Sequence, residues 1–330
     1  MISYIIRRVI IAVPLLISLS IVAFIIIQLP PGDYLTTYIQ ALEAGGQIVT
    51  EAEVARLQAQ YGLDQSIYVQ YMKWMSGIFR GDLGRSFHWQ APVIEVIMDR
   101  LPVTLLLSFA SLLVVYIIAI PVAIVSAVYQ YSLFDYFATL FGFIGLAVPD
   151  FLLALVISWL FFLVSGTMVT SLFSLQFRDA PWSFAKFMDL LGNVWLPILI
   201  IGMAGTAGLI RTLRATLLDE LSRPYVVTAR SKGLSETRLL FKYPVRIAMN
   251  PIFSTIGWLL PSLINGGVLV GIVLNLQLIG PALMEATLSQ DMYLAGSIVL
   301  ILSVLTVVGT LVSDILLAWL DPRIRYAERE

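Results

Sequence analysis

The chain has 330 residues, of which 59% are hydrophobic and 12% charged, so it is more apolar than globular domains, which are about 45–50% apolar. It has no cysteine, which excludes disulfides and thiolate metal sites. Its one histidine, His88, is too few for a histidine-cluster metal site and makes a Ser-His-Asp arrangement hard to build. The formal net charge of −1 says nothing about partners, and we expect no nucleic-acid partner. Several apolar runs exceed the roughly 18 residues that suggest a membrane span. Composition therefore predicts an all-α polytopic membrane protein.

Residues 1–29 predict a short basic lead and a first transmembrane helix, with its apolar run at Val9–Leu29. The run is longer than the apolar region of a signal peptide and no small-x-small cleavage site follows it, so we expect a retained anchor. Pro30-Pro31-Gly32 ends it.

Residues 30–100 are the main polar segment, and we expect them to form a loop domain outside the membrane. Thr50 and Glu53 match a capping box, and Gly62 can close that helix.

A second helix is expected over Ile67–Phe79, because apolar and aromatic residues recur there at three- and four-residue spacing. Two interpretations of this aromatic stripe stay open, a packing face or a docking surface for a partner protein. The stripe consists of Tyr68, Tyr71, Trp74 and Met75.

Residues 101–330 are expected to hold five further spans, which makes six in all. Pro149 and Asp150 interrupt the second of these five, and Gly267 and Gly271 have a helix-packing spacing. We expect a loop over 275–291. The five spans are expected at about 102–128, 136–164, 190–210, 247–274 and 292–320.

A charged loop, residues 211–250, separates two of these spans. Eight basic residues lie between Arg211 and Arg246, against three acidic ones. A short helix is expected from about Arg223 to Lys232, with Ser222 as N-cap and a proline in its first turn.

Gly233 suits the left-handed residue that ends this helix, and Ser235 can cap the next one. The loop is therefore predicted to be helix, glycine turn, helix.

Residues 228–234, Thr-Ala-Arg-Ser-Lys-Gly-Leu, resemble the TAR-x-KGL form of the EAA loop in dipeptide/oligopeptide permeases of binding-protein-dependent ABC importers. Val227 and Thr228 stand where the general EAA consensus has Glu and Ala. The external segment YGLDQSIYVQYMKWMSGIFRGDLGRSF and the LDPRIR sequence near the end are similar to the same family.

The resemblance implies the type I ABC importer permease architecture, with six transmembrane helices and alternating access. It also implies a second homologous permease subunit, two ABC ATPase subunits and an extracytoplasmic solute-binding protein. No cofactor is expected in this chain, because ATP and Mg would be bound by the partner ATPases. The residues implied in ATPase coupling are Pro224, Val226, Val227, Thr228, Ala229, Arg230, Lys232, Gly233 and Leu234.

Peptides are the substrate that the resemblance implies by default. The family's E-x-V-F-x-x-P-G-L-G pattern is replaced here by residues 271–280, so oligosaccharides, which related importers carry, stay open.

Lysine and arginine placement predicts the orientation. With six spans, a cytoplasmic N-terminus puts both termini and residues 211–250 on the side that carries more basic residues. We therefore expect a multi-pass protein of a bacterial or archaeal cytoplasmic membrane.

No phosphate-binding loop or paired catalytic constellation is found in the sequence, so we expect a transport subunit rather than an enzyme. Asp150, Asn265 and Gly266 are the candidates for the translocation path, with helix pairing or packing as the alternative role for each. An ion-coupled secondary transporter that uses Asp150 is the alternative function.

Overall fold

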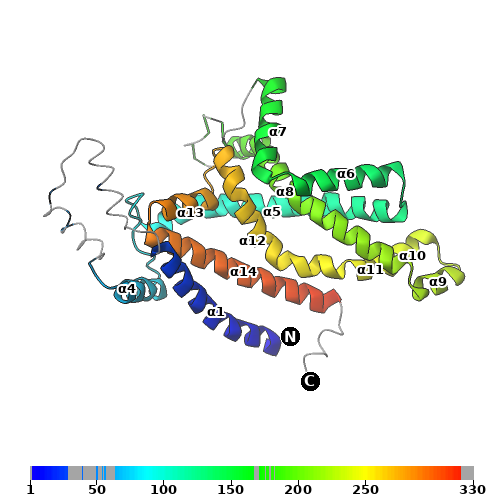
Figure 1. Cartoon of the computed structure of the whole chain (residues 1–330), viewed down its shortest axis with the longest axis horizontal. Helices are drawn as coiled ribbons and strands as arrows, with labels where there is room; N and C mark the ends of the chain where they lie inside the picture. The colour runs from blue at the N-terminus through cyan, green and yellow to red at the C-terminus, as the bar shows by residue number, and fades with distance from the viewer. Residues whose placement is uncertain are drawn as a thin grey trace. The chain divides into compact units, whose positions relative to one another are not determined.

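The computed structural model describes residues 2–28, 64–166, 171–174 and 183–320, with a few positions between these ranges. This part of the chain is helical and contains no β-strand, which confirms the all-α prediction (Figure 1). Glu53 and Gly62 of the predicted capped helix, and residues 321–330 of the LDPRIR ending, lie outside the described residues.

Four described helices contain a stretch long and apolar enough to cross a membrane, namely α1 (Ile2–Gln28), α5 (Val93–Val128), α8 (Phe184–Leu221) and α14 (Met292–Leu320). A fifth span is possible if α6 (Leu133–Ala147) and α7 (Asp150–Ser165) count as one. The predicted span 247–274 coincides with helix α12 (Asn250–Val273), whose central side chains lie outside the described residues. The number of six spans stays a prediction.

The predicted span 136–164 is not one straight helix, because α6 and α7 meet at a bend of 110°. Pro149 has no amide hydrogen and disfavours the helical conformation of the residue before it. Val148 is accordingly extended, with φ −94° and ψ 125°, and α7 starts at Asp150.

Two further boundaries differ from the prediction. Helix α8 was expected to end near residue 210, but it continues to Leu221, since no proline and no glycine follows Gly208 within it. The expected 275–291 loop contains helix α13 (Ile279–Leu288). Ala282 and Ala286 are buried one turn apart in α13, so packing on one face stabilises a helix too short to be stable alone.

The described chain divides into two compact units. The first unit comprises residues 1–103 and 278–305, with α1, helix α4 (Ile67–Phe79), α13 and the start of α14. Trp74 of α4 is its central side chain, only 2% exposed, with its ring 5.7 Å from that of Phe24. Trp74 Nε1 donates a hydrogen bond of 3.4 Å to Ser297 Oγ. Gly296 allows this close approach, because a Cβ there would lie 2.9 Å from the Trp74 ring.

The aromatic stripe of α4 thus has two different faces. Tyr71 and Trp74 pack on Phe24, which confirms packing for these two residues. Tyr68 is 80% exposed, so it has no such packing role.

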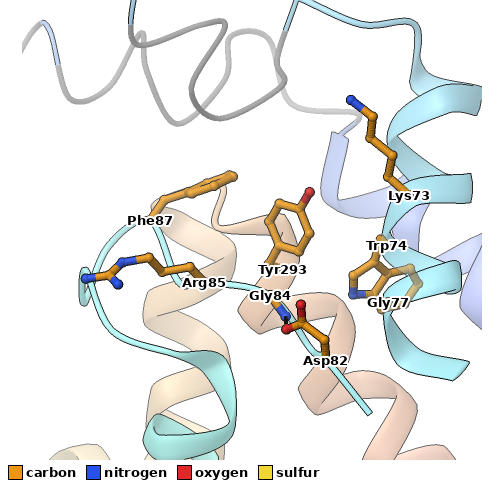
Figure 2. Close-up of a pocket in the computed structure, with 8 residues that line it drawn as sticks. All are labelled: Lys73, Trp74, Gly77, Asp82, Gly84, Arg85, Phe87 and Tyr293. Atoms are coloured by element: carbon orange, nitrogen blue, oxygen red, sulfur yellow. Dashed lines mark hydrogen bonds between the residues drawn. The ribbon is translucent and has the colours of Figure 1, made fainter. Parts of the chain in front are cut away.

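A turn segment, Gly81–Pro92, follows α4 and lies against the start of α14 (Figure 2). Gly84 has φ +82° and sits against Tyr293, where a Cβ would approach Tyr293 Cδ1 to 2.6 Å. Asp291, which is fully buried, accepts hydrogen bonds from Ser86 Oγ at 2.5 Å and from the His88 amide at 3.0 Å. The turn segment is therefore fixed to the α13–α14 corner by both packing and hydrogen bonds.

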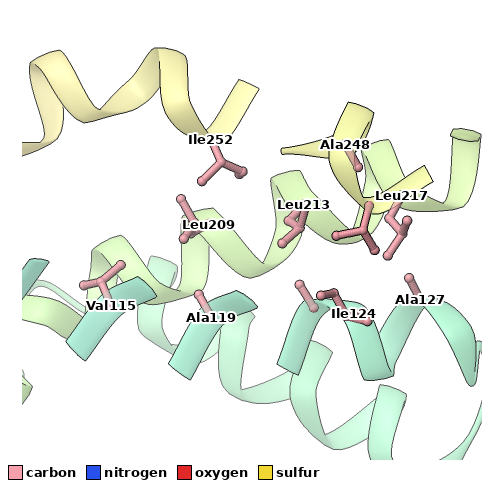
Figure 3. Packing of buried hydrophobic residues seen from close by; sticks show 11 residues of the cluster. Val115, Ala119, Ile124, Ala127, Leu209, Leu213, Leu217, Ala248 and Ile252 are labelled. Atoms are coloured by element: carbon pink, nitrogen blue, oxygen red, sulfur yellow. The ribbon is translucent and has the colours of Figure 1, made fainter. Parts of the chain in front are cut away.

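The second unit comprises residues 104–277 and 306–330, and its core lies between α5, α8 and the segment from α11 (Pro244–Ala248) into α12 (Figure 3). Small residues on α5 face larger ones on α8 and so bring the helix backbones close together. The buried residues are Val115, Ala119, Ala123, Ile124 and Ala127 of α5, Leu209, Leu213 and Leu217 of α8, and Val245, Ala248 and Ile252.

Candidate functional site: the α9–α10 loop

The charged loop folds as predicted, with helix α9 (Pro224–Ser231), a glycine turn and helix α10 (Glu236–Lys242). Gly233 has φ +75°, which confirms the left-handed residue that the sequence placed there.

The predicted N-cap at Ser222 is wrong. Pro224 occupies the first turn and favours an extended residue before it, so Arg223 becomes the N-cap with φ −70° and ψ 145°. The Ser222 hydroxyl instead donates to the Asp219 carbonyl at the end of α8. Ser235 does stand at the N-cap of α10, although its side chain makes no capping hydrogen bond.

One face of α9 packs on α10. Val226 is fully buried, Ala229 is 8% exposed, and both contact Leu239 of α10, which is 1% exposed. Tyr225, Leu234 and Tyr243 surround this small core. Val226 and Ala229, which the sequence assigned to coupling, therefore hold the two helices together and do not present their side chains to a partner.

The opposite face of α9 is exposed. Val227, 54% exposed, is its apolar centre, and the residues around it are polar or basic. The exposed members of the predicted set are Pro224, Val227, Thr228, Arg230, Lys232 and Gly233.

Two side-chain contacts fix the orientation of α9. Arg230 donates to both carboxylate oxygens of Glu236, at 2.6 and 3.0 Å, and so spans the glycine turn. These hydrogen bonds lower the pKa of Glu236. Tyr225 donates at 2.5 Å to Glu220 in the last turn of α8, and burial together with this hydrogen bond raises the pKa of Tyr225. Helix α9 is therefore attached to the end of α8 as well as to α10.

The same end of α8 is tied to the α5–α6 turn by a buried ion pair. Arg214 donates from Nε and from its terminal NH2 group to the two oxygens of Asp135, both at 2.7 Å. Ser126 of α5 and the Tyr131 amide also donate to Asp135, whose side chain is 3% exposed. This Asp135–Arg214 clasp joins α5, α6 and α8 at one point.

Sequence reasoning did not identify the clasp. The signal that could have found half of it is Ser132-x-x-Asp135, a helix N-cap pattern, and Ser132 does accept from the Asp135 amide at 3.2 Å. Nothing in the sequence indicates that Arg214 is its partner.

The predicted translocation-path residues lie on two helices that pack on each other, α7 and α12. Asp150 is the first residue of α7, directly after the 110° bend, and no hydrogen bond or ion pair of its side chain is found among the described residues. Asn265 and Gly266 lie within α12, and their side-chain surroundings are outside the described residues. Next to them, Gly267 is buried against Ile201 of α8.

A second candidate site is a pocket of about 290 Å³ in the first unit, between α4, the turn segment and Tyr293 (Figure 2). Lys73 and Arg85 contribute basic groups to its lining and Asp82 a carboxylate. In the part of the chain that the structure describes, no group of histidine, aspartate or glutamate side chains could hold a metal ion.

Comparison with known proteins agrees with this arrangement. Residues 119–326 match the family "Binding-protein-dependent transport system inner membrane component", and residues 1–108 match the corresponding N-terminal family. The oligopeptide transport system permease protein AppB of Bacillus subtilis is 35% identical over 327 residues, which cover 99% of this chain and all of AppB.

The inner membrane ABC transporter permease protein YejB of Escherichia coli O157:H7 is 30% identical, over 99% of this chain and all of YejB. This chain is thus similar to both relatives along its whole length. It belongs to the family of inner membrane components of binding-protein-dependent transport systems.

Proposed function

We propose that this chain is one permease subunit of an ATP-driven importer, and that it carries peptides delivered by an extracytoplasmic solute-binding protein. Two whole-length relatives are permeases by name, and AppB is named for oligopeptide transport, which supports peptides as the substrate class. The partners in this proposal are a second homologous permease, two ATPase subunits that bind ATP and Mg, and the solute-binding protein.

The observation that carries the proposal is the two-faced structure of α9. A short helix with an exposed apolar centre and basic surroundings can dock in a groove of a soluble partner. Val227 would enter the groove, and Arg230 and Lys232 would face acidic groups at its edge. The buried face on α10 and the Tyr225–Glu220 hydrogen bond keep α9 from moving independently of α8.

Alternating access follows from that attachment. When the ATPase subunits close on ATP, they would displace α9, and α8 would transmit the displacement to the membrane helices. The bend puts the Asp150 carboxylate at the start of α7, beside α12, and this supports a place for Asp150, Asn265 and Gly266 along the translocation path.

The orientation in this proposal puts the α9–α10 loop and both termini in the cytoplasm. The concentration of basic residues between Arg211 and Arg246 supports it. Residues 30–100 would then be outside, where a solute-binding protein can reach the turn segment and α4.

The chain has no cysteine, so single cysteines can test the proposal by crosslinking in the assembled complex. Thr228→Cys lies on the exposed face of α9 and should crosslink to an ATPase subunit with a short bifunctional reagent. Tyr129→Cys is the matched control, because Tyr129 is 63% exposed but belongs to the α5–α6 turn and not to α9. Equal crosslinking from both positions, or none from Thr228→Cys, would contradict docking through α9.

A further inference from the structure

The second unit contains a groove of about 250 Å³ between α6 and α8 that neither the coupling site nor the translocation path uses. Its α6 side is formed by residues such as Ala138, Gly142 and Leu146, and its α8 side by Ala207 and Ile210. These residues offer almost only carbon atoms. The groove follows α6 from Ala138 to Leu146, which are eight helical rises apart, or about 12 Å at 1.5 Å per rise.

The polar groups of this groove gather at one end. Arg211 and Arg214 of α8 line that end, which is the end nearer to α9. Arg214 is committed to Asp135 in the clasp. Arg211 is exposed, and no ion pair of its side chain is found among the described residues. The groove therefore combines an apolar channel with one uncompensated guanidinium at its mouth.

We propose that this groove binds one anionic phospholipid, with the headgroup phosphate on Arg211 and part of an acyl chain along Gly142 and Ala207. The ligand must be an amphiphile, because a small anion would use only the arginine end and leave the apolar channel empty. Basic pockets between membrane helices are a recurrent site for anionic headgroups. A helix of another subunit could fill the apolar channel equally well. Such a helix would not carry a phosphate to pair with the Arg211 guanidinium.

The position of Arg211 supports a headgroup rather than a group deep in the membrane. Arg211 directly follows the uncharged stretch 190–210 of α8, and it is the first charged residue of this helix after Asp189. A phosphate at this point would be at a membrane edge, with its acyl chain extending back toward Leu146 and Ala207. One lipid would then contact α6 and α8 beside the clasp that joins them.

Two substitutions separate the headgroup from the chain. Arg211→Gln removes the phosphate partner and leaves the channel open. Gly142→Leu fills the channel and leaves the arginine in place, and it should be tolerated because a Cβ at Gly142 meets no atom within 4 Å. Arg238→Gln is the matched control, since Arg238 is an exposed basic residue of α10 outside the groove. Arg211→Lys keeps the charge and should keep binding.

The measurement is native mass spectrometry of the full chain, purified in detergent with its native partner subunits and titrated with phosphatidylglycerol or phosphatidylcholine. The parent should bind one phosphatidylglycerol in preference to phosphatidylcholine. Arg211→Gln should weaken phosphatidylglycerol binding about fivefold, the factor for one basic residue at an anionic surface. Gly142→Leu should lose the preferred lipid, while Arg238→Gln and Arg211→Lys should bind like the parent.

Three results would overturn the proposal. If Arg211→Gln bound phosphatidylglycerol like the parent, Arg211 would not be the headgroup contact. The site would be one for free anions if Arg211→Gln weakened lipid binding, Gly142→Leu did not, and inorganic phosphate competed with the lipid. An equal loss in Arg238→Gln would mean attraction to the basic loop as a whole. Thermal unfolding of each variant, measured in parallel, shows whether a loss of lipid reflects a loss of fold.

Discussion

Arg214 of α8 binds both carboxylate oxygens of Asp135 at 2.7 Å, and the Asp135 side chain is only 3% exposed. Each charge is thereby neutralised by the other next to apolar helices, where a lone charge would be costly. The pair joins the turn between α5 and α6 to the part of α8 that leads to α9. A displacement of α9 therefore has to move these helices together or break the clasp.

Loss of the Arg214 charge should destabilise the protein strongly. Arg214→Gln leaves a buried carboxylate without its cation, and breaking a buried pair in this way costs about 3 kcal/mol or more. Arg223→Gln is the matched control, because Arg223 pairs with Glu220 at 3.7 Å and is 59% exposed, and such pairs contribute about 0–1 kcal/mol. The measurement is the unfolding midpoint of each purified variant in detergent. Similar midpoints for the two variants would show that the clasp adds no more than a surface pair.

Two glycines of the turn segment should respond differently to alanine. Gly81 and Gly84 have nearly the same φ, +81° and +82°, so the backbone strain of an alanine is alike in both, about 1–2 kcal/mol. Only at Gly84 does the new Cβ collide, at 2.6 Å from Tyr293, whereas at Gly81 nothing lies within 4 Å. Gly84→Ala should therefore lower the unfolding temperature more than Gly81→Ala and speed proteolysis within residues 81–92. The reverse order would mean that the turn segment does not pack on Tyr293.

The turn between α9 and α10 should tolerate asparagine at Gly233 but not valine. Asparagine adopts positive φ readily, whereas a β-branched residue does so only with strain. A Cβ at Gly233 meets no atom, so backbone conformation alone decides the result. Gly233→Val should displace Leu234 from its packing and reduce ATPase association, with normal amounts of chain in the membrane. Gly233→Asn should co-purify with the ATPase like the parent. If both variants co-purified equally with the ATPase, the conformation of this turn would not be needed for ATPase binding.

Neutralising Asp150 should change transport without changing assembly. The Asp150 side chain has no hydrogen bond or ion pair among the described residues, so Asp150→Asn should leave membrane insertion and complex formation intact. Uptake of a labelled peptide by vesicles that contain the complex should fall, because we propose that this carboxylate lines the translocation path. A variant that fails to accumulate would instead point to a structural partner of the carboxylate.

Regular helix positions could be predicted from the sequence because they depend on local patterns. The α4 boundaries follow from three- and four-residue spacing, and Gly233 follows from the turn chemistry between two short helices. The break at Pro149 was also visible. Its 110° angle was not, because proline ends a helix without setting the direction of the next one.

Contacts between distant segments could not be predicted. Asp135 and Arg214 are 79 positions apart, and Ser86 and Asp291 are 205 apart. Seen alone in the sequence, each of these four residues looks like an ordinary helix cap or surface polar residue. The burial of Val226 was missed for a related reason, because α9 is short enough that either of its faces could have been the inner one.

Helix α8 runs without a break from Phe184 to Leu221, through Pro197, and its 38 residues measure about 57 Å. In the proposed coupling, such a helix would act as a rigid lever that is moved through α9. If it pivots at Pro197, the 24 residues from there to Leu221 form an arm of about 36 Å, so a rotation of about 10° moves its tip by roughly 6 Å. A small closure of the proposed ATPase partners would then be enough to tilt the membrane part of α8. The position of the pivot would determine how far that part moves.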